Sequence, residues 1–319
     1  MQITDELKLE IDKKISNVSI NDLKRHSSQL STQYKEIGSR GNSLLVSDYQ
    51  KLAYISVRMP ATYATIVQTL RELSNRTPSI YIENALDVGA GPGTGLWALR
   101  EAFSSSLKQV TLLEKDSGFI RIGQELYGNR TGIEVKWVGC DASMAESFLP
   151  HDLVLASFAL GEFQEPDWRK TLLSMWQATR KFLIVIEPGT PRGFGMIRKM
   201  REILLEQGGH LAAPCPHSQT CPMQGSDWCH FAARVERTSI HRQIKNATMN
   251  YEDEKFCYLI FSREKLVEYP ARILTRPQKN NGYVNLKLCS SKGVENITIS
   301  RKSKDDYRRA RKSEWGDTL

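Results

Sequence analysis

Residues 84–95 read Asn-Ala-Leu-Asp-Val-Gly-Ala-Gly-Pro-Gly-Thr-Gly, and this stretch decides the fold. A short apolar run containing Asp87 leads into glycines at alternate positions, Gly89, Gly91 and Gly93, before a helical pattern begins. Glycine is needed where a loop takes positive φ values or where a ligand comes close to the backbone. The alternate spacing, with an acid two positions before the first glycine, differs from the G-x-G-x-x-G loop of dinucleotide-binding folds. We therefore expect a ligand-binding turn between a strand and a helix.

The segments around this turn predict three regions. Between residues 85 and 187, short apolar runs alternate with amphipathic runs, which is typical of successive βα units in a parallel sheet. Residues 1–78 read as helical, with a break expected at Pro60. The sequence thus predicts an α/β, Rossmann-like domain over residues 79–263, preceded by a helical region. A β-rich extension with a basic tail follows over residues 264–319.

Composition limits where the protein works. Of its 319 residues 40% are hydrophobic, yet no segment reaches the roughly 18 uninterrupted apolar residues of a membrane helix. The N-terminus is charged and lacks the apolar stretch of a secretory signal. We expect a cytoplasmic protein without a membrane partner. In a reducing compartment its six cysteines are candidates for metal ligands or catalytic thiols and not for disulfides.

The positive charge is unevenly distributed. Residues 1–189 carry 21 Lys and Arg against 22 Asp and Glu, whereas residues 190–319 carry 23 against 14. A one-sided positive field suits a polyanion such as RNA or DNA. A solvated charged helix and a disordered tail are the alternative. The candidate RNA-binding residues lie on a predicted helical stripe and in the tail, where Trp315 is expected to stack on a base: Arg234, Arg237, His241 and Lys245, then Arg308, Arg309, Arg311 and Lys312.

Three cysteines gather in an insertion predicted at about residues 210–245. Cys215, Cys221 and Cys229 are separated by five and seven residues, unlike the short C-x2-C knuckles of common zinc sites. Prolines and aromatic residues around them indicate a rigid, partly dry pocket. Irregularly spaced thiolates suit an iron–sulfur cluster, which usually has four sulfur ligands. Zinc, with help from His217 or His230, and unliganded thiols are the alternatives.

The acid-Gly-x-Gly-x-Gly stretch resembles motif I of the class I S-adenosylmethionine-dependent methyltransferases. The resemblance implies that Asp87, Gly89, Gly91 and Gly93 contact the amino acid part of S-adenosylmethionine. Two later acids end the second and third predicted strands, and they are Glu114 and Asp141. A carboxylate at the first position can accept hydrogen bonds from both ribose hydroxyls. By resemblance, the second contacts the adenine amino group. A turn without a ligand and solvated strand-end acids are the alternatives.

Several motifs beyond residue 214 resemble the methyltransferase-like proteins of the mitochondrial small ribosomal subunit and their bacterial relatives. They occur in the expected order, and the resemblance runs from about Lys51 to the C-terminus. It implies a [4Fe-4S] cluster, a pocket for S-adenosylmethionine, and association with the small ribosomal subunit and its rRNA during assembly, the protein being a monomer off the ribosome. The motifs include CPHSQTCP (215–222), DWCHFAARVERTSIHRQIK (227–245), YEDEKFCYLIFSR (251–263), ARILTRP (271–277) and YRRARKSEWGD (307–317).

The resemblance carries three cluster ligands over directly, as Cys215, Cys221 and Cys229. Cys257 and Cys289 compete for the fourth position. Cys257 lies inside an apolar run that reads as a strand, where a buried thiol packs as a small hydrophobic group. Cys289 ends a strand-like run before a polar turn, and the family also places a cysteine after a strand here. We therefore predict Cys289 as the fourth ligand.

No catalytic residue is predicted. Amino-group methyltransferases commonly carry Asn/Asp-Pro-Pro-aromatic after the fourth strand, and residues 157–162 read Ser-Phe-Ala-Leu-Gly-Glu. Cytosine C5 chemistry needs a cysteine nucleophile, and the sheet region offers only Cys140, which we interpret as a packed thiol. Two hypotheses therefore stand. The protein methylates small-subunit rRNA, or it is a non-catalytic assembly or translation factor that uses the methyltransferase fold as an RNA-binding scaffold.

Overall fold

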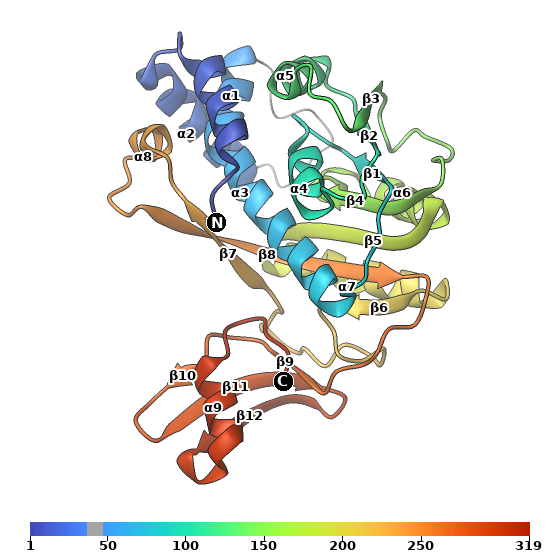
Figure 1. Ribbon diagram of the computed structural model, residues 1–319, viewed down its shortest axis with the longest axis vertical. Helices are drawn as coiled ribbons and strands as arrows, with labels where there is room; N and C mark the ends of the chain where they lie inside the picture. The colour runs from blue at the N-terminus through green and yellow to red at the C-terminus, as the bar shows by residue number, and fades with distance from the viewer. Residues whose placement is uncertain (37–46) are drawn as a thin grey trace.

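The computed structural model describes residues 1–36 and 47–319, and its centre is a mixed sheet with the strand order β3-β2-β1-β4-β5-β8-β6 (Figure 1). The eighth strand of this sheet, β7, lies off this path and pairs with β8. The strands of this sheet are β1 (Asn84–Val88), β2 (Gln109–Glu114), β3 (Glu134–Gly139), β4 (His151–Ser157), β5 (Thr179–Pro188), β6 (His210–Ala213), β7 (Phe231–Glu236) and β8 (Tyr251–Ser262).

The predicted α/β, Rossmann-like class is confirmed by the pairing of these strands. β1 to β5 run parallel, whereas β8 is antiparallel to β5, and both β6 and β7 are antiparallel to β8. The chain leaves β1 toward β2 on one side and returns to β4 on the other. Ligands bind in the crevice that such a reversal opens at the carboxyl ends of the strands. This crevice is where the glycine loop lies.

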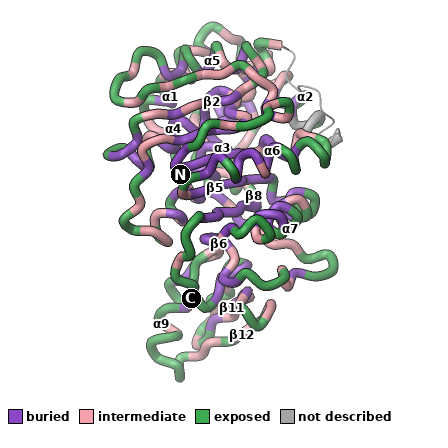
Figure 2. Tube along the Cα trace, turned by 90° about the vertical axis from the view of Figure 1, so that its right-hand side faces the viewer, coloured by how far each residue is buried: buried purple, intermediate pink, exposed green. Residues whose placement is uncertain are grey.

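Helices cover both faces of the sheet, as the period of two in its strands requires. On β4, Leu153 and Leu155 pack toward the α3 side, while Val154 and Ala156 pack toward the α6 and α7 side. The buried strands therefore form the centre of three layers (Figure 2). The helices of the two faces are α1 (Asp5–Ile15), α2 (Ile20–Glu36), α3 (Asp48–Arg76), α4 (Thr94–Ala102) and α5 (Ser117–Tyr127) on one, and α6 (Glu165–Ala178) and α7 (Pro191–Glu206) on the other.

The break predicted at Pro60 is wrong, because α3 is continuous through it. A proline in a helix interior loses one backbone hydrogen bond and crowds the preceding turn. Here nearly every residue from Ala53 to Leu70 is buried, including Pro60 itself. The free energy gained by burying this face outweighs the local cost. α3 therefore runs as one long rod across the sheet (Figure 1).

The C-terminal residues form a second, smaller sheet with its own core. Its strands are β9 (Ala271–Ile273), β10 (Gln278–Lys279), β11 (Tyr283–Ser290) and β12 (Gly293–Ser300), and α9 (Lys304–Lys312) packs on β11 and β12. The buried core is small: Ala271, Ile273, Val284, Leu286, Leu288 and Ala310. This unit lies at the opposite end of the molecule from α5 (Figure 1). In the described ranges no helix is long and apolar enough to cross a membrane.

The predicted basic helical stripe is wrong. Arg234 lies on strand β7, where buried and exposed residues alternate, and only Ser239–Lys245 forms the short helix α8. His241 is fully buried, and Lys245 is half-buried. The basic residues recur at steps of three and four by coincidence. In β7, buried and exposed residues alternate with the period of two that is typical of a strand.

Candidate cofactor pocket and cysteine cavity

The glycine loop after β1 adopts the conformation that its glycines predict. Gly89, Gly91 and Gly93 have φ values of +73°, +53° and +81°, a region that residues with a side chain rarely adopt. The N–H groups of Gly89 and Ala90 both donate to the carbonyl oxygen of Leu113, 2.9 Å away, which ties the loop to β2. A Cβ at Gly91 would meet no heavy atom within 4 Å, so this backbone faces open space.

Asp87 lies beneath the loop and does not line the pocket. Its side chain is buried, and neither carboxylate oxygen has a hydrogen-bond partner among the residues of the described structure. Burial and the neighbouring Glu114 raise the pKa of Asp87 to about 7. A Cβ at Gly95 would stand 2.2 Å from its Oδ2. The glycine at position 95 therefore makes room for the acid, and Asp87 supports the loop from below.

Glu114 ends β2 and fixes the loop while facing the pocket. Its Oε2 accepts the N–H of Gly91 at 2.8 Å, and its Oε1 accepts the N–H of Asp116 at 2.8 Å. Burial raises the pKa of Glu114, although backbone hydrogen bonds from Asp116, Gly91 and Lys115 oppose the shift. A carboxylate has about four acceptor sites, so Glu114 keeps acceptor capacity for a hydroxyl donor in the pocket.

Asp141 lies two residues beyond β3 on the same pocket. Its Oδ1 accepts the Ser143 N–H at 3.0 Å and the Ser143 hydroxyl at 2.7 Å, and Lys115 Nζ lies 3.5 Å from Oδ2. Burial alone would raise the pKa of Asp141, but these contacts outweigh it and the pKa is lowered. Asp141 is therefore an ionised acceptor at the edge of the pocket.

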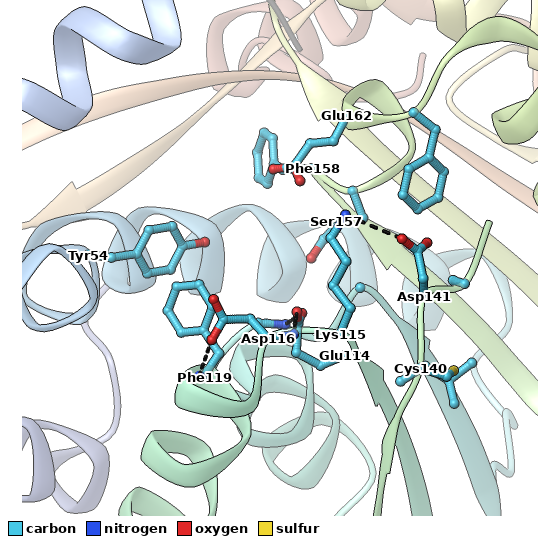
Figure 3. A pocket seen from close by; sticks show the side chains of 16 residues that line it. Tyr54, Glu114, Lys115, Asp116, Phe119, Cys140, Asp141, Ser157, Phe158 and Glu162 are labelled. Atoms are coloured by element: carbon cyan, nitrogen blue, oxygen red, sulfur yellow. Dashed lines mark hydrogen bonds and ion pairs between the residues drawn. The ribbon is translucent and has the colours of Figure 1, made fainter. Parts of the chain in front are cut away.

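The pocket has further walls that the sequence analysis did not single out as site residues. Tyr54 comes from α3 and meets the ring of Phe119 edge-on, with centroids 5.2 Å apart. Phe158 follows β4 with a φ of +56°, unusual for a side chain of this size. Glu162 lies in the same wall, and burial, reinforced by Glu114, raises its pKa to about 7. Figure 3 shows these side chains around one hollow with Glu114 and Asp141.

A second cavity brings the predicted metal ligands together. Cys215, Cys221 and Cys229 come from the segment between β6 and β7, and Cys289 comes from β11 of the small sheet. All four line one cavity, together with Cys257 of β8. None of the cysteines forms a disulfide. The fold thus joins thiols that lie up to 74 positions apart in the chain.

The two candidates for the fourth ligand differ in what their sulfurs contact. Cys257 Sγ donates to the carbonyl oxygen of Cys229 at 3.1 Å, so it is engaged with the backbone. Cys289 Sγ lies 3.8 Å from His217 Nε2. Burial and neighbouring thiols raise the pKa of Cys289 to about 12. This thiol is therefore protonated at neutral pH unless a metal takes the place of the proton.

A site for a single metal ion is not formed by these groups. In residues 1–36 and 47–319 no three His, Cys, Asp or Glu side chains converge closely enough to hold one ion. A zinc ion needs its sulfur ligands within about 2.3 Å of one centre. The thiolates of a four-iron cluster instead bind different irons, so they surround a larger volume. Thiols that do not converge on one point do not fit a single zinc ion, whereas a four-iron cluster does not require them to converge.

The predicted RNA-binding residues are divided between two surroundings. Arg234 binds Asp253 through two contacts of 2.9 and 3.2 Å, and Arg237 is 2.8 Å from Glu252. The four tail residues instead lie exposed on α9. Trp315 is not free to stack on a base, because it packs edge-on against His230 at 5.1 Å, and its ring nitrogen is buried.

The strand order, the glycine loop after β1 and the acids after β2 and β3 define a class I S-adenosylmethionine-dependent methyltransferase fold. A model of the family described as mitochondrial small ribosomal subunit Rsm22 matches residues 48–319. The chain therefore belongs to the Rsm22 family.

Two curated relatives and two solved structures illustrate what the chain is similar to. It is 26% identical to the human mitochondrial ribosome assembly protein METTL17, over 84% of this chain and 62% of the relative. It is 27% identical to the mitochondrial Rsm22-cox11 tandem protein 2 of Schizosaccharomyces pombe, over 93% of this chain and 47% of the relative. The chain thus spans less than two thirds of the length of either protein.

The solved structures are more distant. Magnesium protoporphyrin IX methyltransferase of Synechocystis PCC 6803, with bound S-adenosylhomocysteine, is 13% identical, with a TM-score of 0.42 over 73% of this chain and 94% of that chain. The N-methyltransferase NodS of Bradyrhizobium japonicum WM9 is 13% identical, with a TM-score of 0.41 over 63% of this chain and 96% of that chain. The assignment of the fold therefore rests on the strand order and on the family match.

Proposed function

We propose that this protein binds S-adenosylmethionine and acts on the small ribosomal subunit during assembly, as a methyltransferase for its rRNA. The observation that carries the proposal is the meeting of Gly91, Glu114 and Asp141 on one pocket. Gly91 leaves backbone space for the amino acid part of the cofactor, Glu114 keeps acceptor sites for the ribose hydroxyls, and Asp141 accepts from the adenine amino group. Membership of the Rsm22 family supports the ribosomal partner.

When bound, S-adenosylmethionine would supply a methyl group whose bond to sulfur breaks as its bond to the acceptor forms. An amino acceptor must then lose a proton. Glu162 lies on the pocket wall, and its raised pKa of about 7 suits proton uptake near neutral pH. Tyr54 and Phe158 supply apolar surface beside it. Glu162 is therefore the candidate proton acceptor if the acceptor atom is an amine.

One observation favours the second candidate function, a non-catalytic assembly or translation factor. Residues 157–162 lack the Asn/Asp-Pro-Pro-aromatic motif and read Ser-Phe-Ala-Leu-Gly-Glu instead. In this alternative the same pocket binds the cofactor, and the fold provides a scaffold for RNA without turnover.

Incubation of immature small subunits with S-adenosylmethionine labelled in its methyl group tests the choice. We expect the wild-type protein to label the rRNA and Gly91→Arg to leave it unlabelled, because the arginine occupies the space beside the loop. If the wild-type protein binds the cofactor but labels no assembly intermediate, the non-catalytic function is the correct one.

We also propose a [4Fe-4S] cluster held by Cys215, Cys221, Cys229 and Cys289. Four thiols on one cavity support it, because a [4Fe-4S] cluster usually has four sulfur ligands. When bound, the cluster would supply one-electron redox chemistry and would join the β6–β7 segment to the small sheet. Anaerobic purification followed by analysis of iron, sulfide and zinc is the test. Stoichiometric zinc without sulfide would contradict the cluster.

We propose in addition that α9 contacts rRNA. Its basic residues are exposed, and Arg309 and Lys312 make no ion pair with any described residue. The pairing of Arg234 and Arg237 with acids of β8 makes them weaker candidates for phosphate contacts.

A further inference from the structure

Arg201 is a buried cation on the wall of the cysteine cavity. It lies on α7 and is 3% exposed. One terminal nitrogen donates to the carbonyl oxygens of His217 and Gln219, at 2.9 and 2.6 Å. Its Nε is buried without a hydrogen-bond partner, and no carboxylate in the described ranges forms an ion pair with it. A buried charge without a counter-charge is strongly destabilising, so its neighbourhood should contain an anion.

Arg272 lines the same cavity but is in a different electrostatic situation. It is 1% exposed and pairs with Glu72 at 2.6 Å. Its remaining donors reach the carbonyl oxygen of Pro214 at 2.9 Å and the Tyr269 hydroxyl at 2.6 Å. The charge of Arg272 is thus balanced within the protein, whereas the charge of Arg201 is not.

Besides Arg272, Arg198 and the Tyr258 phenol, the polar and thiol-bearing side chains that share the cavity with Arg201 are five cysteines and the His217 imidazole. Burial raises the pKa of Cys215, and the charge of Arg201 opposes the rise. The same opposition acts on Cys289. The His217 ring faces the same cavity, with Nε2 3.8 Å from Cys289 Sγ. Arg201 is therefore a buried cation beside thiol groups that become anionic when they bind a metal.

We propose that Arg201 is the counter-ion of the metal–thiolate centre in the cysteine cavity. The proposal rests on the cluster proposed above, and it assigns a charge partner that is not itself a ligand. A [4Fe-4S] centre with four thiolates is an anion, and its negative charge increases when it is reduced. A fixed cation in a dry wall stabilises the more negative state, and so raises the reduction potential.

The position of Arg201 has a signal in the sequence. It lies four residues after Ile197 and seven after Phe194, which places a charge on the apolar face of α7. Arg198 is one turn earlier on the same helix and reaches the rim of the cavity, but it is half-exposed and lies over the Phe194 ring. Water screens its charge from the cavity. The pair Arg201 and Arg198 therefore forms a matched comparison.

The test is a redox titration of the reconstituted full-length protein, followed by electron paramagnetic resonance. We expect Arg201→Gln to retain iron and sulfide, to be reduced at a more negative potential than the wild type, and to lose iron faster to a chelator. Arg201→Lys, which keeps the charge, should stay near the wild-type potential. Arg198→Gln should shift the potential less than Arg201→Gln.

Equal potentials for wild type and a loaded Arg201→Gln would overturn the proposal, as would equal shifts in Arg201→Gln and Arg198→Gln. If Arg201→Gln does not fold, Arg201→Lys decides, and a loaded Lys variant with a potential far below that of the wild type would contradict the charge role. Wild-type protein without iron and sulfide would instead reject the cluster itself, which is a separate failure.

Discussion

The cofactor pocket and the cysteine cavity lie in one molecule but are built by opposite means. The pocket draws its key groups from consecutive strand ends, and the loop between Gly89 and Gly93 is organised by contacts with neighbouring β2. The cavity draws its thiols from the β6–β7 segment, from β8 and from the small sheet. Its assembly therefore depends on the packing of parts that are distant along the chain.

The two sites also differ in their charge. The pocket contains carboxyl groups, and S-adenosylmethionine carries a positive sulfonium. The cavity contains neutral thiols and a buried cation, Arg201, which suit a ligand that creates negative charge. On the functions proposed above, one site would bind a cation and the other an anionic centre, and we expect that each can be removed by a substitution that leaves the other intact.

The largest difference between two variants is expected at Cys289 and Cys257, the two candidates for the fourth cluster ligand. Cys289→Ser should lose nearly all cluster iron and sulfide, because one of the four ligands is removed. Cys257→Ser should retain them, since the Cys257 thiol contacts the carbonyl oxygen of Cys229 and the shorter hydroxyl can make a similar hydrogen bond. Iron and sulfide analysis after anaerobic purification measures both. Retention in Cys289→Ser with loss in Cys257→Ser would move the fourth ligand to β8.

A second substitution removes the other site alone. Gly91→Arg should weaken S-adenosylhomocysteine binding by about 100-fold or more, about 2.7 kcal/mol. The side chain would occupy the open space beside the loop, and the left-handed backbone adds a strain of about 1–2 kcal/mol. Isothermal titration calorimetry measures the affinity.

The matched control for this substitution is Gly282→Arg in the small sheet. Gly282 also has a positive φ, +92°, and open space around its Cβ position. It should suffer the same backbone strain without losing affinity. Equal affinities for Gly91→Arg and Gly282→Arg would show that the loop is not the binding site. Iron content should be unchanged in Gly91→Arg.

The difference between the sites explains what could be predicted from the sequence. Gly89, Gly91, Gly93 and Glu114 follow local rules of strand and turn, so their places were predictable. The joining of Cys289 to the other cysteines needed the family resemblance, because nothing local ties β11 to the β6–β7 segment. The sequence analysis did not predict a role for Arg201, although the sequence places this charged residue on the apolar face of α7.

Two errors have the same physical origin. The helical stripe through Arg234 relied on spacing alone, while the alternation of β7 and the acids of β8 give that residue a strand position and a partner. The expected break at Pro60 relied on backbone chemistry, while burial of the surrounding helix prevails. In both cases tertiary packing decided between patterns that a local reading weighs equally.

The carboxyl groups of the cofactor pocket predict that its affinity for S-adenosylmethionine depends on pH. Below about pH 7 Glu162 is protonated and neutral, and above it the carboxylate attracts the sulfonium, because its pKa is raised to about 7. Asp87 has the same raised pKa of about 7 and acts in the same direction. Affinity for S-adenosylmethionine should rise several-fold from about pH 6 to about pH 8. S-adenosylhomocysteine lacks the sulfonium, so its affinity should change less.

Calorimetry at the two pH values, with Glu162→Gln as the variant, separates these contributions. The variant should show a flatter pH dependence for S-adenosylmethionine, with a residual slope from Asp87. An unchanged slope in Glu162→Gln would remove this residue from the electrostatics of the pocket. The iron content of the protein should not follow the same pH dependence.

The smallest effect is expected on the basic surface, where α9 and β7 can be compared directly. Replacing Arg309 and Lys312 together by Gln should weaken rRNA binding about several-fold and lower the salt dependence by about one ion per lost phosphate contact. Both side chains are exposed on α9 without an ion pair in the described structure. Fluorescence anisotropy with a fragment of small-subunit rRNA, at several salt concentrations, measures both quantities.

Arg234→Gln provides the contrast to the α9 variant. Its guanidinium lies over the Tyr251 ring at 4.0 Å and holds Asp253, so little of its charge is available to phosphate. We expect RNA affinity and its salt dependence to stay close to the wild-type values. A larger loss from Arg234→Gln than from the α9 pair would move the RNA surface from the small sheet to the edge of the large one. The cysteine cavity lies between these sheets. In that case it would stabilise the fold but would not position the RNA-binding surface.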